Sequence, residues 1–224
     1  MATSTDPHSP FEAVKGRVVY VFAAMLFLQL TYPFSLQGDA QNLAYYATYC
    51  LLLASGVYVA SVNRNHFLFA SAAALLTLCF GIPYVFDGGE TLWLTLANFA
   101  SLVLYQSTIV FVLLMFVFTK DEVTRDVLYA ASTVYILFGN TFTALYMIIQ
   151  TLQPDAFVTS NLETPIAWPY MVYYSYSTLT TLGYGDIVPR SAWVQSLAAV
   201  EAMLGPLYIA IIIGRLASVY KAET

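Results

Sequence analysis

The sequence predicts an all-α membrane protein with six transmembrane helices and one shorter, re-entrant helix. Hydrophobic residues make up 59% of the chain and charged residues only 9%, whereas soluble domains carry about 25% charged residues. A helix needs roughly 20 apolar residues to cross a bilayer. Six stretches meet this requirement: 17–36, 43–62, 66–86, 91–119, 127–150 and 192–219. The segment 168–180 is too short to cross, and such a helix is tolerated at membrane depth only when protein surrounds it.

The basic residues predict the orientation of the chain. Arg190 lies on one side of the predicted spans, and the other seven Lys and Arg residues lie on the opposite side: Lys15, Arg17, Arg64, Lys120, Arg125, Arg215 and Lys221. Cytoplasmic loops are enriched in Lys and Arg. We therefore expect a multi-pass protein of the cell membrane, in contact with membrane lipids and with both termini cytoplasmic. Residues 1–16 are expected to form a cytoplasmic tail, and no soluble regulatory domain is expected in this chain.

Two other classes of protein fit the sequence poorly. The net charge is -5 and no basic patch is visible, so the sequence does not favour nucleic-acid binding. No nucleophile, base and orienting residue occur together, so no enzyme is predicted.

The first apolar stretch is not expected to be a cleaved signal peptide, because it is long and lacks a clear small-x-small cleavage site.

The segment 181–186, Thr-Leu-Gly-Tyr-Gly-Asp, follows the short helix directly. A site that removes water from a cation must replace the lost oxygens with backbone carbonyls, and this requires unusual backbone angles in alternation. Gly183 and Gly185 provide such angles because a residue without a Cβ adopts left-handed conformations without steric cost. Thr181 adds a hydroxyl oxygen, and Tyr184 can turn its ring outward. We call residues 181–186 the filter segment.

The filter segment and its surroundings carry a resemblance to a known family. The residues concerned are Tyr173, Tyr174, Ser175, Thr178, Thr180, Thr181, Gly183, Tyr184, Gly185, Asp186 and Pro189. Together they resemble the pore helix, filter and outer mouth of the potassium channel family, in which valine is common where this chain has Leu182. The resemblance implies a potassium-selective homotetramer with K⁺ as permeant ion and no other cofactor. Each chain would coordinate K⁺ through backbone carbonyls of Thr181, Leu182, Gly183 and Tyr184 and through the Thr181 hydroxyl, with Gly185 completing the filter.

The resemblance also implies which residues support the filter segment. Tyr173 and Tyr174 occupy the positions of an aromatic pair that surrounds the filter tyrosine, here Tyr184. Several relatives have a glutamate where this chain has Ser177, so Asp186 is expected to bond to Trp168 or to water instead. The residues expected to support the filter are Tyr173, Tyr174, Ser177, Thr178, Thr180, Asp186 and Glu201.

Glu201 is the only acidic residue within the last apolar stretch. An intramembrane carboxyl group is costly unless it is paired or hydrated, so such a residue marks a candidate functional site. Three roles remain open. The side chain would brace the pore helix through the hydroxyls of Ser177 or Thr178, act as a proton-sensitive gate, or face a cavity and attract cations.

Gly205 and Pro206 form a candidate gating hinge. Gly205 lies 19 residues after Asp186, at the position of the inner-helix glycine hinge in the family. Pro206 removes the hydrogen bond to the Ala202 carbonyl, which predicts a kink. A moving hinge and a fixed bend are both compatible with this pattern.

The chain is predicted to divide into a peripheral four-helix domain, 17–119, and a pore domain, 120–224. The pore domain contains an outer helix 127–150, the pore helix 168–180, the filter segment and an inner helix 192–219. No charged residue occurs between Glu90 and Lys120. Since each charge moved across 100 mV supplies only about 2.3 kcal/mol, the fourth span cannot be a steep voltage sensor, and little voltage dependence is expected.

Three alternative functions remain. A non-selective cation channel would use the same scaffold with a wider or shorter filter. A non-conducting membrane sensor or partner subunit would keep the architecture without ion flow. A secondary potassium transporter normally carries four pore loops in one chain, and this sequence has one.

Overall fold

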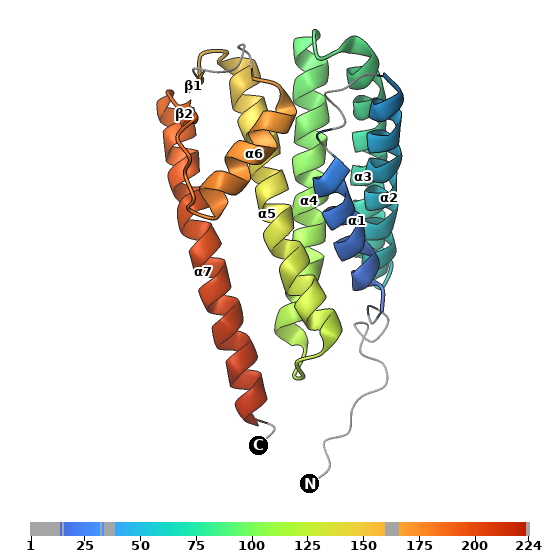
Figure 1. The fold of residues 1–224 in the computed structure, drawn as a ribbon. Coiled ribbons are helices and arrows are strands. Elements are labelled where there is room, and N and C mark those ends of the chain that lie inside the picture. Colours follow the sequence, from blue (N-terminus) through green and yellow to red (C-terminus); the bar gives the residue numbers. More distant parts are fainter. Residues whose placement is uncertain (1–13, 15, 32, 34–38, 160–165, 223–224) are drawn as a thin grey trace.

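The structure, a computed structural model, describes residues 14, 16–31, 33, 39–159 and 166–222. The first half of the described chain consists of α1 (Val18–Thr31), α2 (Asp39–Ala60), α3 (Arg64–Asp87) and α4 (Leu92–Thr119). The second half consists of α5 (Arg125–Leu152), β1 (Phe157–Thr159), α6 (Trp168–Leu179), β2 (Ile187–Pro189) and α7 (Ala192–Ala222). This arrangement confirms the predicted all-α membrane protein (Figure 1).

Four helices in the described residues are long and apolar enough to cross a membrane: α3, α4, α5 and α7. Helix α1 has 14 residues, which at 1.5 Å per residue span about 21 Å, less than the ~30 Å hydrocarbon core. Helix α2 contributes the shorter apolar segment Ala47–Ala60. The first stretch was predicted to extend to residue 36, but residues 32 and 34–38 lie outside the described part of the chain, as does most of the predicted tail 1–16. The count of six crossings stays a prediction.

Helix α4 joins the two halves of the molecule. Its buried side chains Tyr105, Ile109 and Leu113 share one apolar core with Val134 and Leu137 of α5. A polar contact crosses the same interface, because the Thr141 hydroxyl donates to Gln106 Oε1 at 2.9 Å. Hydrogen bonds of this kind between membrane helices contribute about 0.6 kcal/mol on average. The first four helices are thus packed against the helix that supports α6.

Helix α6 enters the bundle from one end and stops near its middle. The chain then turns and returns to the same end through β2 (Figure 1). Strand β2 pairs antiparallel with β1, with Phe157 opposite Pro189 and Thr159 opposite Ile187. These two short strands were not predicted from the sequence. They join the chain that leads into α6 to the chain that leaves the filter segment.

Helix α1 begins and α7 ends at the same end of the bundle (Figure 1), and Arg17 and Arg215 bond to the ends of neighbouring helices there. The Arg17 guanidinium donates to the Tyr58 carbonyl and the Ser61 hydroxyl at the end of α2. The Arg215 guanidinium donates to the carbonyls of Phe118 and Lys120, where α4 ends. The cytoplasmic location of this end remains a prediction.

Candidate functional site

Helix α6 begins at the residues that the sequence indicated. Ala167 is its N-cap and Pro169 lies in its first turn, where the missing N–H of proline leaves no helical hydrogen bond unmade. The buried Gln150 of α5 fixes the chain just before α6. Its Nε2 donates to the Ile166 carbonyl at 2.6 Å, and its Oε1 accepts from the Ile166 amide at 3.3 Å. Thr180 is the C-cap. The helix therefore points its C-terminal, partly negative end toward the middle of the bundle.

Glu201 lies on α7 and is completely buried. Its Oε2 accepts a hydrogen bond from the Tyr146 hydroxyl of α5 at 2.6 Å. Its Oε1 accepts one from the Ser175 hydroxyl of α6 at 2.5 Å. The prediction that Ser177 or Thr178 would bind this carboxyl group was wrong, because the Thr178 hydroxyl donates back to the Tyr174 carbonyl of its own helix, while Ser177 contacts the filter segment.

The carboxyl group of Glu201 therefore connects three helices. Buried carboxyl groups are tolerated when hydrogen bonds compensate for lost hydration, and here two hydroxyls do so. Because Glu201 has no exposed surface, the cavity-facing alternative is contradicted. The arrangement corresponds to the bracing role. Tyr146, which makes one of the two bonds, was not identified from the sequence.

Ser177 is the residue of α6 that holds the filter segment. Its carbonyl accepts from the amides of Leu182 at 2.9 Å and Gly183 at 3.1 Å. Its hydroxyl accepts from the Tyr184 amide at 3.3 Å. The Thr181 amide donates to the Thr178 carbonyl at 2.9 Å. Four consecutive amides are thus directed back to α6, so their carbonyls remain available on the other side of the backbone.

The backbone of the filter segment alternates in conformation. Thr181, Gly183 and Gly185 have φ angles of 60°, 57° and 80°. Left-handed angles were predicted for the two glycines but not for Thr181, and a residue with a Cβ adopts them rarely. Such strain costs about 1–3 kcal/mol and persists only where the surrounding contacts impose it.

Tyr173 and Tyr174, the two tyrosines of α6 that were predicted to surround Tyr184, have different partners. The Tyr173 ring stacks on the Tyr184 ring, with centroids 5.7 Å apart and planes inclined by 10°. Tyr174 is buried and packs edge-on against Tyr146 at 5.0 Å and Phe157 at 5.2 Å. Within one chain Tyr174 therefore packs on α5 and β1 rather than on Tyr184, and its contact with Tyr184 of a neighbouring chain stays a prediction. Successive helical residues point in directions about 100° apart, so one of the two faces α5.

Thr180 and Asp186 are the remaining predicted support residues. The Thr180 hydroxyl donates to the Tyr176 carbonyl at 2.7 Å, which extends the end of α6. Asp186 is exposed, and its Oδ1 accepts from the Ile187 amide at 3.1 Å. The expected bond between Asp186 and Trp168 stays a prediction.

Gly205 and Pro206 lie inside α7, which continues without interruption from Ala192 to Ala222. Gly205 is buried, and a Cβ at this position would collide with the Leu179 carbonyl at the end of α6. This glycine therefore permits close packing between α6 and α7. From the sequence Gly205 was predicted only as a hinge, and whether the helix moves here stays a prediction.

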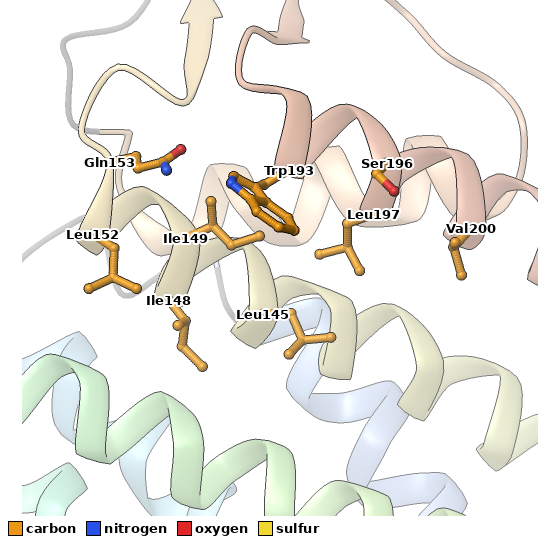
Figure 2. A pocket seen from close by; sticks show the side chains of 9 residues that line it. All are labelled: Leu145, Ile148, Ile149, Leu152, Gln153, Trp193, Ser196, Leu197 and Val200. Carbon is orange, nitrogen blue, oxygen red and sulfur yellow. The ribbon is translucent and has the colours of Figure 1, made fainter.

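An open surface pocket of about 490 Å³ lies between the ends of α5 and α7 that are nearest to β1 and β2. Figure 2 shows its lining, in which Leu145 and Ile149 of α5 approach Trp193 and Leu197 of α7. The lining contains no titratable side chain. Among the residues that the structure describes, no three His, Cys, Asp or Glu side chains come together to hold a metal ion. The polar chemistry of this half is concentrated around α6 and the filter segment.

Comparison with known proteins gives one family match. A family model described as "Ion channel" matches residues 152–222, which extend from the end of α5 through α6 and the filter segment to the end of α7. The match indicates an ion channel. It points to a transport protein rather than an enzyme, and helices α1–α4 lie outside it. No curated protein and no solved structure matches the chain.

Proposed function

We propose that the chain forms a homotetrameric, potassium-selective channel of the cell membrane, with little intrinsic voltage dependence and both termini cytoplasmic. Each chain contributes the carbonyls of Thr181, Leu182, Gly183 and Tyr184 to a shared ion path. Conduction is passive, and K⁺ moves in single file between rings of oxygens that replace its hydration shell. Helix α5 supports this pore from outside and α7 lines its inner half.

The single observation that carries the proposal is the alternation at Thr181, Gly183 and Gly185. Left-handed angles at every second residue, with φ of 60°, 57° and 80°, bring successive carbonyls toward the same side of the backbone. Ser177 engages the amides of Leu182, Gly183 and Tyr184 from the opposite side. A strand held in this way suits repeated coordination of a dehydrated cation.

Exposure of the filter segment supports assembly into an oligomer. All residues from Thr181 to Asp186 are exposed in the isolated chain. They nevertheless follow the end of α6 at about half the height of the bundle, away from both ends (Figure 1). Irregular backbone at membrane depth must be buried in protein or line a water-filled path, because lipid cannot satisfy its polar groups. Further copies of the chain provide that cover, and four strands surround one ion in the potassium channel family.

Helix α4 supports the expected weak voltage dependence. Its 28 residues, Leu92–Thr119, contain no charged side chain, so α4 has no charge to move through the membrane field. The proposal therefore assigns the first four helices a role other than voltage sensing.

The proposal is tested by ion flux into liposomes that contain only the purified protein. Wild-type protein should pass K⁺ in strong preference to Na⁺. Gly183→Ala should lose this preference, because φ at position 183 is +57° and a Cβ strains such a conformation by about 1–2 kcal/mol. Gly88→Ala is the matched control: Gly88 has φ of +67°, also has open space around it, and lies at the end of α3.

Each outcome of the flux experiment has a definite meaning. Equal passage of Na⁺ and K⁺ by the wild type contradicts potassium selectivity and favours a non-selective cation channel. Passage of neither ion favours a non-conducting sensor or partner subunit.

The number of chains is tested separately, by a mass measurement of the intact complex. A number of chains other than four contradicts the proposed assembly.

A further inference from the structure

A second polar cluster, separate from the contacts of Glu201, links α6 to α1 and α5. It contains Gln29 of α1, Asn140 of α5 and Tyr176 of α6. Gln29 Nε2 donates to Tyr176 Oη at 2.7 Å and to Asn140 Oδ1 at 3.0 Å. The Tyr176 hydroxyl donates in turn to the Ile136 carbonyl of α5 at 2.7 Å. The Tyr176 hydroxyl thus both accepts and donates, and it joins three helices.

The packing around Tyr176 is specific. Its ring lies directly over Gly139 of α5, where a Cβ would stand 2.5 Å from the nearest ring carbon. Only a glycine allows the ring to cross α5 at this distance and reach α1. Asn140 is held from the α1 side as well, since its Nδ2 lies 3.6 Å from Met25 Sδ.

Tyr176 is also close to the filter segment along the chain. Its carbonyl accepts the Thr180 amide at 3.0 Å and the Thr180 hydroxyl at 2.7 Å. The next residue, Ser177, accepts the amides of Leu182, Gly183 and Tyr184. A displacement of Tyr176 therefore moves both the end of α6 and the group that holds the filter segment.

We infer that Gln29 and Tyr176 are positioning residues through which the first helix of the peripheral domain holds α6 and the filter segment in place. Tyr176 lies inside the region that matches the ion channel family, whereas Gln29 and Asn140 lie outside it. The peripheral domain thus stabilises the filter geometry through a direct polar link, in addition to the apolar packing between α4 and α5. The consequence for conduction rests on the proposed function, but the link itself does not.

The test is hydrogen–deuterium exchange of the full-length protein in nanodiscs, read in peptides that cover residues 177–184. Gln29→Met replaces the amide by an apolar chain of similar length, and Tyr176→Phe removes only the hydroxyl. Each should raise exchange in 177–184 several-fold, because the amides bound to Ser177 open more often. The double variant should exchange no faster than the faster single variant, since both changes break one link.

Tyr105→Phe is the matched control. The Tyr105 hydroxyl donates to the Leu52 and Leu53 carbonyls of α2, so this variant loses a buried tyrosine bond within the peripheral domain without touching α6. It should leave exchange in 177–184 at the wild-type rate. Gln29→Asn keeps the amide but shortens its reach by one methylene, and it replaces Gln29→Met if that variant does not fold.

Unchanged exchange in 177–184 in both single variants would overturn the inference. So would an increase in Tyr176→Phe alone, because Tyr176 would then act through Ile136 without α1. An equal increase in Tyr105→Phe would show a general loosening of the bundle and would also overturn it. Exchange does not require ion flow, so this result is independent of the flux experiment, whose failure concerns the proposed function alone.

Discussion

Gly205 of α7 lies against the backbone carbonyl of Leu179, at the point where α6 ends and the filter segment begins. The contact brings two backbones together with no side chain between them. It gives Gly205 a packing role that does not depend on motion. A substitution that adds a small side chain at position 205 therefore tests the packing role.

Gly205→Ala should therefore destabilise the assembled protein. The added methyl group must displace a backbone carbonyl rather than a flexible side chain, and such overpacking costs about 1–3 kcal/mol. A lower thermal midpoint, together with reduced K⁺ flux, is the expected result. Gly214→Ala is the control, because Gly214 lies on the same helix with no atom near the position of a Cβ. Equal stability of the two variants would contradict the packing role.

Tyr146→Phe should weaken the attachment of α7 to α5. The variant leaves one oxygen of the buried Glu201 carboxyl group without its partner, and an unsatisfied buried acceptor costs about 1–3 kcal/mol. Tyr208→Phe is the comparison, because it also removes a hydrogen bond between α5 and α7. The group that loses its partner in this variant is only a backbone carbonyl, that of Ala131. We expect a larger fall in thermal midpoint for Tyr146→Phe. A similar or smaller fall would argue against the importance of the Glu201 contacts.

Glu201→Gln separates bracing from proton-sensitive gating. Glutamine keeps the size of the side chain and an oxygen that accepts hydrogen bonds, but it does not titrate. Because the carboxyl group is enclosed between Tyr146 and Ser175, we expect flux measured across pH to have the same profile in the variant and the wild type. Loss of a wild-type pH dependence in the variant would instead support the gate.

Ser177→Ala should disturb the filter segment locally. It removes the hydroxyl that accepts the Tyr184 amide but keeps the carbonyl that accepts two other amides, so the loss should be about 0.5–1.5 kcal/mol. The expected result is a lower preference for K⁺ over Na⁺ in the flux assay with little change in overall stability. Ser101→Ala is the control, because that buried hydroxyl of α4 donates to the Asn98 carbonyl. Unaltered selectivity in Ser177→Ala would refute this role.

Current through the purified wild-type protein should depend only weakly on voltage. Helix α4 carries no charge, and each charge that crosses 100 mV contributes about 2.3 kcal/mol. The measurement is the conductance of single reconstituted channels over a range of potentials, without blocking ions. A conductance that rises steeply over tens of millivolts would contradict the prediction.

Much of the architecture follows from local sequence. The apolar lengths predicted the membrane class, and the ranges 127–150, 168–180 and 192–219 overlap α5, α6 and α7. Proline in the first turn of α6 and the glycines of the filter segment act through their own backbone geometry. Such effects need no knowledge of distant parts of the chain. The sequence alone therefore determined that this is an apolar helical protein with a short re-entrant helix before a glycine-containing turn.

Only the tertiary structure decided which side chains meet. Ser175 and Thr178 are three residues apart and share a face of α6, so spacing could not choose the partner of Glu201, and Tyr146 comes from a helix 55 positions earlier in the chain. The left-handed Thr181, the packing of Gly205 and the reach of Gln29 to Tyr176 likewise depend on how the helices are placed against one another. A hydrogen bond or a close backbone contact is sensitive to fractions of an ångström, and helix packing sets those distances. The sequence pattern predicts only the face of its helix on which each residue lies.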